Sequence, residues 1–180
     1  MRLFTAITFS EGMKDYLSEV SNRLSLLTVK GSFTLRDNYH LTLNFIGETS
    51  RLELVKEAMQ QAVAKTDPGS FLLQTEGFGR FKRREGDICF IRIEKEPVLF
   101  KLQKELVRRL KDAGFEVDDL EYKPHLTLSR RTAFADKFDE KLFEEQISQI
   151  SMEVSRISLM KSERIHGRLT YTELYGIDLD

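Results

Sequence analysis

The tetrapeptide His-Leu-Thr-Leu occurs twice in this 180-residue chain, once beginning at His40 and once at His125. The copies are therefore 85 residues apart, close to half the length of the chain. Only three histidines are present, and two of them begin these copies. A segment repeated at this spacing indicates an internal duplication with two similar halves. It would also give one pocket a pair of imidazoles and a pair of hydroxyls.

Each copy has the apolar and polar pattern of a β-strand, in which successive side chains point to opposite faces. The polar face is expected to hold His40, Thr42 and Asn44 in the first copy and His125, Thr127 and Ser129 in the second. The opposite face, with the leucines and Phe45, is expected to pack into the core. Two strands related by a two-fold axis can bring their polar faces together across a cleft.

Paired imidazoles suit the cleavage of a phosphodiester without a metal. A base activates the attacking oxygen while an acid protonates the leaving oxygen on the other side of phosphorus, and imidazole, with an ordinary pKa of about 6.5, can do either. The hydroxyls of Thr42 and Thr127 can hold non-bridging phosphate oxygens. Zinc binding by the two histidines is the weaker alternative, because no third ligand is evident nearby. We therefore expect no metal and no other cofactor.

The periodicity of apolar residues predicts strands and helices in alternation, arranged similarly in the two halves. Strands are expected at residues 3–9, 39–47, 71–81, 87–94 and 124–129, with a closing hairpin formed by 152–162 and 169–177. Helices are expected at residues 10–24, 50–65, 97–112 and 136–150, and residues 28–37 are expected to form a loop or an edge strand. No linker separates the halves, so we expect one bilobal domain over residues 1–180 with its midpoint near residue 85.

Composition limits the classes of partner. The formal net charge is −1, so any contact with nucleic acid would have to be a local patch. Cys89 is the only cysteine, which permits no internal disulfide and fits a reducing cytoplasm. No stretch approaches the roughly 18–20 apolar residues of a membrane helix. We expect a cytoplasmic protein without a membrane partner.

Two further groups of basic residues are candidates for phosphate or RNA contact. Arg80, Lys82, Arg83 and Arg84 lie near the tip of the predicted 71–94 hairpin beside aromatic residues, where they would either contact RNA or form a solvated turn. Arg130 follows the second motif. Strict alternation places it on the leucine face, but a bulge could turn it toward the phosphate, and a surface ion pair is the alternative.

The two motifs carry a resemblance to a known family. The segments 39–47 (YHLTLNFIG) and 124–130 (PHLTLSR) are similar to the paired HxTx motifs of the RNA 2',3'-cyclic phosphodiesterases, also known as 2'-5' RNA ligases, in the 2H phosphoesterase superfamily. Residues 2–7 resemble the opening strand of that family, and Ser162, Gly167, Tyr171 and Leu174 resemble its closing hairpin. Residues 31–38 lack the proline- and tryptophan-containing approach of many members, which bears on substrate preference.

The resemblance implies an α+β fold with two antiparallel sheets, outer helices and a central cleft, and an activity that needs no metal. The reaction implied is hydrolysis of a terminal 2',3'-cyclic phosphate to a 2'-phosphate, and some members also join RNA halves through a 2'-5' linkage. His40 would protonate the leaving 3'-oxygen and His125 would activate water, although the pseudo-symmetry leaves these roles interchangeable. Thr42, Thr127 and Arg130 would bind the phosphate.

Other functions stay open at this point. A phosphodiesterase acting on a small cyclic nucleotide or a 2'-5' oligonucleotide would use the same groups, and an RNA-binding module without catalysis belongs to a different class. The expected partners are RNA ends or small cyclic nucleotides, with no obligate protein partner and a monomeric state.

Overall fold

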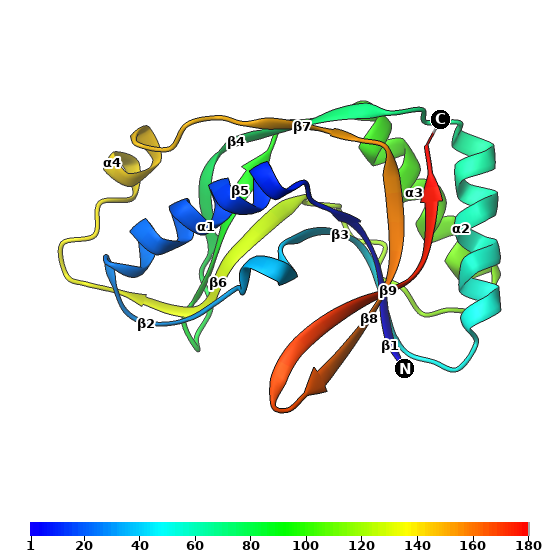
Figure 1. Ribbon diagram of the computed structural model, residues 1–180, viewed down its shortest axis with the longest axis horizontal. Coiled ribbons are helices and arrows are strands. Elements are labelled where there is room, and N and C mark those ends of the chain that lie inside the picture. The colour runs from blue at the N-terminus through cyan, green and yellow to red at the C-terminus, as the bar shows by residue number, and fades with distance from the viewer. Residues whose placement is uncertain (180) are drawn as a thin grey trace.

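The computed structural model describes residues 1–179 and confirms an α+β fold with two antiparallel sheets (Figure 1). The strands are β1 (Arg2–Thr8), β2 (Thr28–Phe33), β3 (His40–Glu48), β4 (Phe71–Phe81), β5 (Asp87–Ile93), β6 (His125–Phe134), β7 (Ser151–Val154), β8 (Arg156–Ile165) and β9 (Arg168–Asp178). The helices are α1 (Glu11–Ser25), a short 3₁₀ turn η1 (Arg36–Asn38), α2 (Leu52–Thr66), α3 (Pro97–Asp112) and α4 (Glu140–Glu145).

The two sheets meet along the strands that carry the motifs. One sheet has the strand order β3-β1-β8-β9 and the other has the order β2-β6-β5-β4-β7. The first motif begins β3 and the second begins β6, and these two strands contact each other although they belong to different sheets. Both motif histidines therefore lie at the junction of the sheets.

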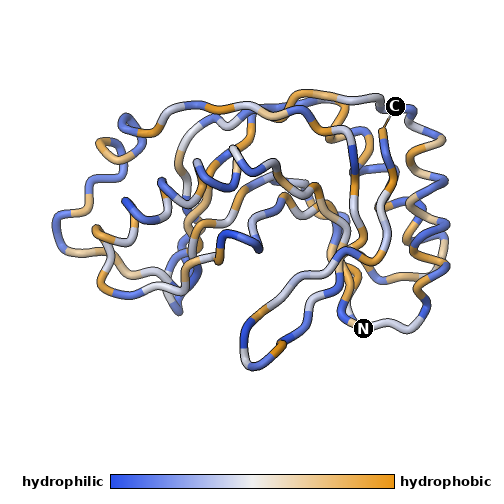
Figure 2. The backbone as a smooth tube through the Cα atoms, viewed as in Figure 1, coloured by the Kyte–Doolittle hydropathy of each residue, from blue (hydrophilic) through white to orange (hydrophobic). Residues whose placement is uncertain are grey.

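The helices tie the two sheets together. The helix α1 follows β1 along the chain, yet it packs on β2 and β6 of the other sheet. In the same way α3 follows β5 but packs on α2 and on β3. A continuous cluster of buried apolar side chains runs through both sheets and the inner faces of these helices, and in Figure 2 apolar and polar residues alternate along most elements. Because α1 and α3 each follow a strand of one sheet but pack on the other sheet, the strands around the junction are held from both sides.

Local signals in the sequence explain where the helices begin and end. Ser10 caps α1 by accepting a hydrogen bond from the Met13 amide at 3.3 Å, as its position predicts. Pro97 occupies the first turn of α3, where no amide donor is needed. Gly114, at a φ of +78°, ends that helix in the left-handed conformation.

The predicted helix over residues 136–150 is wrong in extent, because only Glu140–Glu145 is helical. Asp139 caps this short helix through the Leu142 amide, and the chain then leaves it to join the sheet. The carbonyl of Ile150 accepts from the Thr75 amide at 2.9 Å, and the Ile150 amide donates to the Thr75 hydroxyl at 2.9 Å. Pairing with the sheet thus outweighs the helical pattern.

The remaining differences are smaller. The predicted strand 152–162 is divided into β7, which pairs with β4, and β8, which pairs with β1 and β9. The segment 28–37 contains an edge strand, one of its two expected forms. The closing hairpin turns at His166 and Gly167 as predicted. Within residues 1–179, none of the helices combines the length and the apolar character needed to span a bilayer.

Candidate active site

Both motifs line one small cleft at the junction of the sheets. The cleft has a volume of about 80 Å³. Its lining residues are Thr34, Asn38, His40, Thr42, Phe45, His125, Thr127, Arg130 and Tyr171. A water molecule occupies about 30 Å³ in the liquid, so the cleft can admit a group of a few heavy atoms, such as a phosphate.

The two imidazoles are anchored in the same way. The Nδ1 atom of His40 lies 2.7 Å from the carbonyl oxygen of Asn38, and Nδ1 of His125 lies 2.7 Å from the carbonyl oxygen of Lys123. In each motif the acceptor is therefore the backbone two residues before the histidine. A carbonyl oxygen can only accept, so each Nδ1 carries a proton. Each Nε2 is left as the nitrogen that can accept or donate a proton elsewhere.

Aromatic rings surround both histidines. The His40 ring lies between Phe4, at 5.0 Å between centroids, and the edge of Tyr171, at 5.1 Å. The His125 ring has Phe81 and Phe90 each at 5.3 Å. These rings fix the orientation of the imidazoles and withdraw them from water.

Burial among these rings lowers the pKa of both His40 and His125 below 6.5, because the charged form loses its hydration. The positive charge of Arg130 lowers both pKa values further. His125 adds a repulsive contribution at His40, as expected for two groups that share one cleft. At neutral pH the unliganded site therefore holds two neutral imidazoles beside a guanidinium.

The motif threonines lie beside the histidines. Thr42 Oγ1 is 2.9 Å from His40 Nε2, which places this hydroxyl at the ring nitrogen that is not bonded to the Asn38 carbonyl. Thr127 lines the same cleft, and its backbone carbonyl accepts a hydrogen bond from the Thr34 hydroxyl at 2.9 Å. The two predicted hydroxyls are thus brought together with the two imidazoles.

A β-bulge at the same point of each motif overturns part of the predicted alternation. Pairing shifts by one residue between Thr42 and Asn44 in β3, and between Thr127 and Ser129 in β6. Asn44 and Ser129, expected in the cleft, are instead buried and bonded to Thr5 and Thr132. The residue after each bulge turns into the cleft. Phe45, expected in the core, is 62% exposed and lines the cleft.

The second bulge turns Arg130 toward the cleft instead of the core. Arg130 stands after Ser129 as Phe45 stands after Asn44, and it lines the cleft with both histidines. Within residues 1–179 the Arg130 guanidinium forms no ion pair. The alternative prediction of a surface ion pair is therefore wrong for this part of the chain. The two halves therefore differ here, with an aromatic ring on one side and a cation on the other.

The basic hairpin is divided between two environments. Arg80 pairs with Glu140 at 2.7 Å and with Asp87 at 3.0 Å. Lys82, Arg83 and Arg84 are exposed at the tip, and the guanidinium of Arg83 lies 5.6 Å from the centre of the Phe81 ring. Contact of Arg80 with RNA stays a prediction, but its guanidinium already forms ion pairs with two carboxylates.

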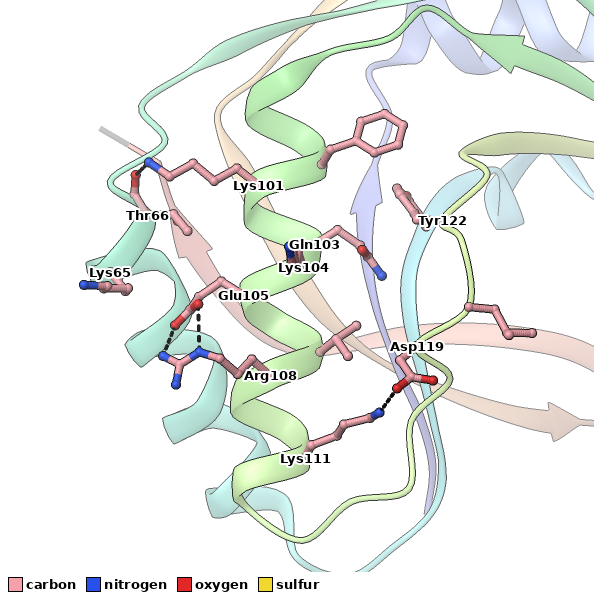
Figure 3. Close-up of a pocket in the computed structure, with 13 residues that line it drawn as sticks. Lys65, Thr66, Lys101, Gln103, Lys104, Glu105, Arg108, Lys111, Asp119 and Tyr122 are labelled. Carbon is pink, nitrogen blue, oxygen red and sulfur yellow. Dashed lines mark hydrogen bonds and ion pairs between the residues drawn. The ribbon is translucent and has the colours of Figure 1, made fainter.

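A wider pocket of about 560 Å³ adjoins the cleft and shares Thr42, Phe45 and His125 with it. Beyond it, a groove of about 680 Å³ lies between α3 and residues 119–122 (Figure 3). Tyr122 stands between the two, and its hydroxyl donates to the Thr42 carbonyl at 2.9 Å. Burial raises the pKa of Tyr122, so it stays a neutral donor.

A zinc site would need more ligands than the two histidines provide. Within the described part of the chain, residues 1–179, no three His, Cys, Asp or Glu side chains gather as a metal-binding group. Cys89 is buried in β5, as its apolar surroundings predict.

Asn38 and Tyr171 are among the cleft residues that sequence reasoning missed. Asn38 holds His40 through its carbonyl, and its side-chain amide donates to the Leu169 carbonyl at 2.9 Å. Tyr171 reaches the cleft from β9 and packs against His40. A polar residue two positions before the first histidine was a weak signal for Asn38. The resemblance assigned Tyr171 only to the closing hairpin, and no local signal marks it as a cleft residue, because its position beside His40 depends on the pairing of distant strands.

A sequence model described as the 2'-5' RNA ligase superfamily matches residues 30–166, a range that contains both motifs and most of the chain. This chain belongs to the 2'-5' RNA ligase superfamily. It is 28% identical over 176 residues to a Thermotoga maritima protein named RNA 2',3'-cyclic phosphodiesterase, covering 97% of this chain and 94% of that one. A protein of the same name from Methanothermobacter thermautotrophicus is 27% identical over 180 residues, covering 97% and 96%.

Solved structures of other proteins have the same fold. The crystal structure of E. coli LigT complexed with 3'-AMP has a TM-score of 0.76 at 24% identity, covering 99% of this chain and 97% of LigT. A Thermus thermophilus protein has a TM-score of 0.77 at 23% identity, covering 99% and 98%. These likenesses extend over nearly the whole chain and support the two-sheet architecture.

Proposed function

We propose that this chain is an RNA 2',3'-cyclic phosphodiesterase, which opens the terminal 2',3'-cyclic phosphate of RNA to a 2'-phosphate by proton transfer between two histidines. One observation carries the proposal: both motif histidines line one cleft of about 80 Å³, and each Nδ1 is held by a backbone carbonyl at 2.7 Å, which leaves Nε2 as the nitrogen for proton transfer. The names of the full-length relatives from Thermotoga and Methanothermobacter support the choice of substrate.

In the proposed reaction His125 Nε2 accepts a proton from water as the water oxygen attacks phosphorus. The bond between phosphorus and the 3'-oxygen breaks, and protonated His40 donates its Nε2 proton to that oxygen. The product is a 2'-phosphate monoester with a free 3'-hydroxyl. Acid and base act in the same step on opposite sides of phosphorus, which is why one imidazole must be charged and the other neutral. The assignment of acid and base follows the family resemblance.

Thr42, Thr127 and Arg130 are proposed to bind the non-bridging oxygens. Hydroxyl and guanidinium donors that point at the developing negative charge stabilise the transition state more than the ground state. The negative charge of the bound phosphate also opposes the lowering of the histidine pKa values by burial and by Arg130. It should raise the pKa of the acid histidine toward the working pH.

A hydrolysis assay tests this function. Purified protein in EDTA is incubated with cytidine 2',3'-cyclic phosphate, and the product is identified by phosphorus NMR. The expected result is turnover to the 2'-phosphate, with EDTA having no effect. Thr170→Val serves as a control for variants of the site threonines and should keep full turnover. Thr170 lies in β9, and its hydroxyl bonds only the Arg168 carbonyl. Absence of turnover, or formation of the 3'-phosphate, would contradict the proposal.

Two finer expectations belong to the same proposal. If a 5'-hydroxyl of a second RNA replaced water as the nucleophile, the same groups would form a 2'-5' linkage, so we propose ligation as a reversible side reaction. The open pockets beside the cleft favour an RNA end over a small cyclic nucleotide, and the paired Nε2 atoms favour catalysis over an inactive RNA-binding module.

We further propose that residues 1–180 form one bilobal domain, because α1 follows β1 but packs on the sheet of β2 and β6, and α3 follows β5 but packs on β3 of the other sheet. A monomeric state and residence in the cytoplasm stay predictions.

A further inference from the structure

Four arginines surround an open pocket next to the catalytic cleft. Arg83, Arg84, Arg130 and Arg131 line this space of about 430 Å³, which we call the arginine pocket. Glu85, Gly86 and Ile88 complete its lining. Two of the arginines come from the β4–β5 hairpin tip and two from β6, so the pocket depends on contact between segments that are distant in sequence.

The backbone is shaped to bring these segments together. Gly86 has a φ of +110°, and a Cβ atom there would lie 2.6 Å from the carbonyl carbon of Arg131. Only glycine permits this approach. Arg131 itself has a φ of +51°, an uncommon conformation for a residue with a side chain. The pairing of β5 with β6 is also irregular between Asp87 and Cys89. The chain thus accepts strain at the point where the hairpin tip meets β6 and four arginines line one pocket.

The charge of the pocket is not neutralised by the protein. Within residues 1–179 none of the four guanidiniums forms an ion pair, and the only carboxylate in the lining is that of Glu85. Nearby Arg80, by contrast, is paired with both Asp87 and Glu140. Like charges held together repel one another, and a bound anion relieves that repulsion. Guanidinium groups are well suited to phosphate, because each can donate two parallel hydrogen bonds.

The arginine pocket is continuous with the cleft. Arg130 lines both, so one guanidinium stands between the cyclic phosphate and the pocket. Arg83 lines the pocket and also the wider 560 Å³ space, where Phe81 lies beneath it and His125 is a neighbour. An RNA chain leaving the cleft along this side would carry its next phosphate into the arginine pocket.

We infer that the arginine pocket binds the phosphodiester that joins the terminal nucleotide to the rest of the RNA. This inference rests on the proposed function. It makes an RNA of two or more nucleotides the preferred substrate over a mononucleotide, because only the former has that phosphodiester.

The test compares cytidine 2',3'-cyclic phosphate with a cytidine dinucleotide that ends in the same group. The unmodified protein should show a kcat/KM at least about tenfold higher for the dinucleotide, the scale of one charge-assisted hydrogen bond. Arg84→Gln and Arg131→Asn should each reduce this preference by several-fold or more, and the double variant should abolish it. Asparagine is chosen at residue 131 because it tolerates the left-handed conformation. Each variant should also have a shallower dependence of dinucleotide binding on salt, because one charge that salt would screen has been removed.

Lys104→Gln is the matched control, because it removes one positive charge from α3 beside the groove of Figure 3. It should leave the preference unchanged, and thermal melting should show that every variant is folded. A preference that survives in the double variant overturns the inference. A preference that is lost in Lys104→Gln but kept in Arg84→Gln also overturns it, since the RNA would then run over α3. If neither substrate is hydrolysed, the proposed function itself fails, which is a different result.

Discussion

Asparagine in place of either histidine should separate the anchoring of the ring from its chemistry. The Nδ1 atom of His40 donates to the Asn38 carbonyl at 2.7 Å, and Nδ1 of His125 donates to the Lys123 carbonyl at the same distance. The amide nitrogen of an asparagine side chain can occupy the position of Nδ1, but asparagine has no group at the position of Nε2. His40→Asn and His125→Asn should therefore keep the anchor and lose the reactive nitrogen. His40→Ala and His125→Ala should lose both.

The expected magnitudes differ for catalysis and for stability. Loss of a general acid or base lowers kcat by about 10²- to 10⁴-fold, and this loss should be the same for Asn and Ala. His40→Ala also leaves the part-buried Asn38 carbonyl without its donor, which costs about 1–3 kcal/mol relative to His40→Asn. For a chain of this size that corresponds to a melting temperature lower by about 2–12 °C. The difference should be smaller at His125, whose anchoring bond is exposed to water.

The assay combines single-turnover rates with thermal melting of the four variants, and it includes a substrate with a p-nitrophenyl leaving group. Such a group leaves without protonation, so it should restore much of the activity of the variant that lacks the acid. We expect this rescue at His40 and not at His125. An Asn variant with more than half the original activity would refute a catalytic role for that histidine. Equal stability of the Asn and Ala variants of His40 would refute the argument about the anchor.

Three further outcomes follow from the same geometry. Burial lowers the folded-state pKa of both His40 and His125. The bell-shaped pH profile of kcat/KM should therefore have its maximum below pH 6.5. The free energy of unfolding should fall as the pH falls below 6.5, because the unfolded state then binds protons that the folded state resists. Tyr122→Phe removes the donor to the Thr42 carbonyl and should lower the free energy of unfolding in urea by about 1–3 kcal/mol; an unchanged midpoint would contradict the contribution of this bond. In Gly86→Ala the alanine must adopt a positive φ, and its Cβ must contact the Arg131 backbone. The substitution should lower the free energy of unfolding by more than about 1 kcal/mol and weaken the preference for the dinucleotide. Wild-type stability together with a wild-type preference would show that the close approach is unnecessary.

The histidine pair could be predicted because its signal is local and repeated. Each copy of the motif predicts a strand and the face of the sheet on which its first three side chains lie. In both copies the side chains follow this alternation up to the leucine after the threonine. The faces of the next residues could not be predicted. The bulges at Leu43 and Leu128 arise from the pairing with β1 and β5, which a single strand does not encode. Arg130 and Phe45 reach the cleft for that reason.

The predicted helix over residues 136–150 failed for a related reason. Its apolar spacing was compatible with a helix, but only Glu140–Glu145 is helical, and Ile150 at the end of the segment bonds to Thr75 of β4. Tyr171 was also beyond local reasoning, because β9 is brought to His40 only through β8 and β1. Elements whose partners are adjacent in sequence, such as the β4–β5 hairpin and the strand β9, were predicted with nearly correct bounds.

Nitrogen-15 NMR of the histidine rings tests whether one phosphate is shared by the two imidazoles. The unliganded protein at pH 7.5 should show His40 and His125 as neutral rings with the proton on Nδ1. On titration with cytidine 2'-monophosphate at pH 6, both Nε2 resonances should move together, with the same dissociation constant and one ligand bound for each chain. Movement of only one resonance, or two different dissociation constants, would contradict a site in which both rings act on a single phosphate.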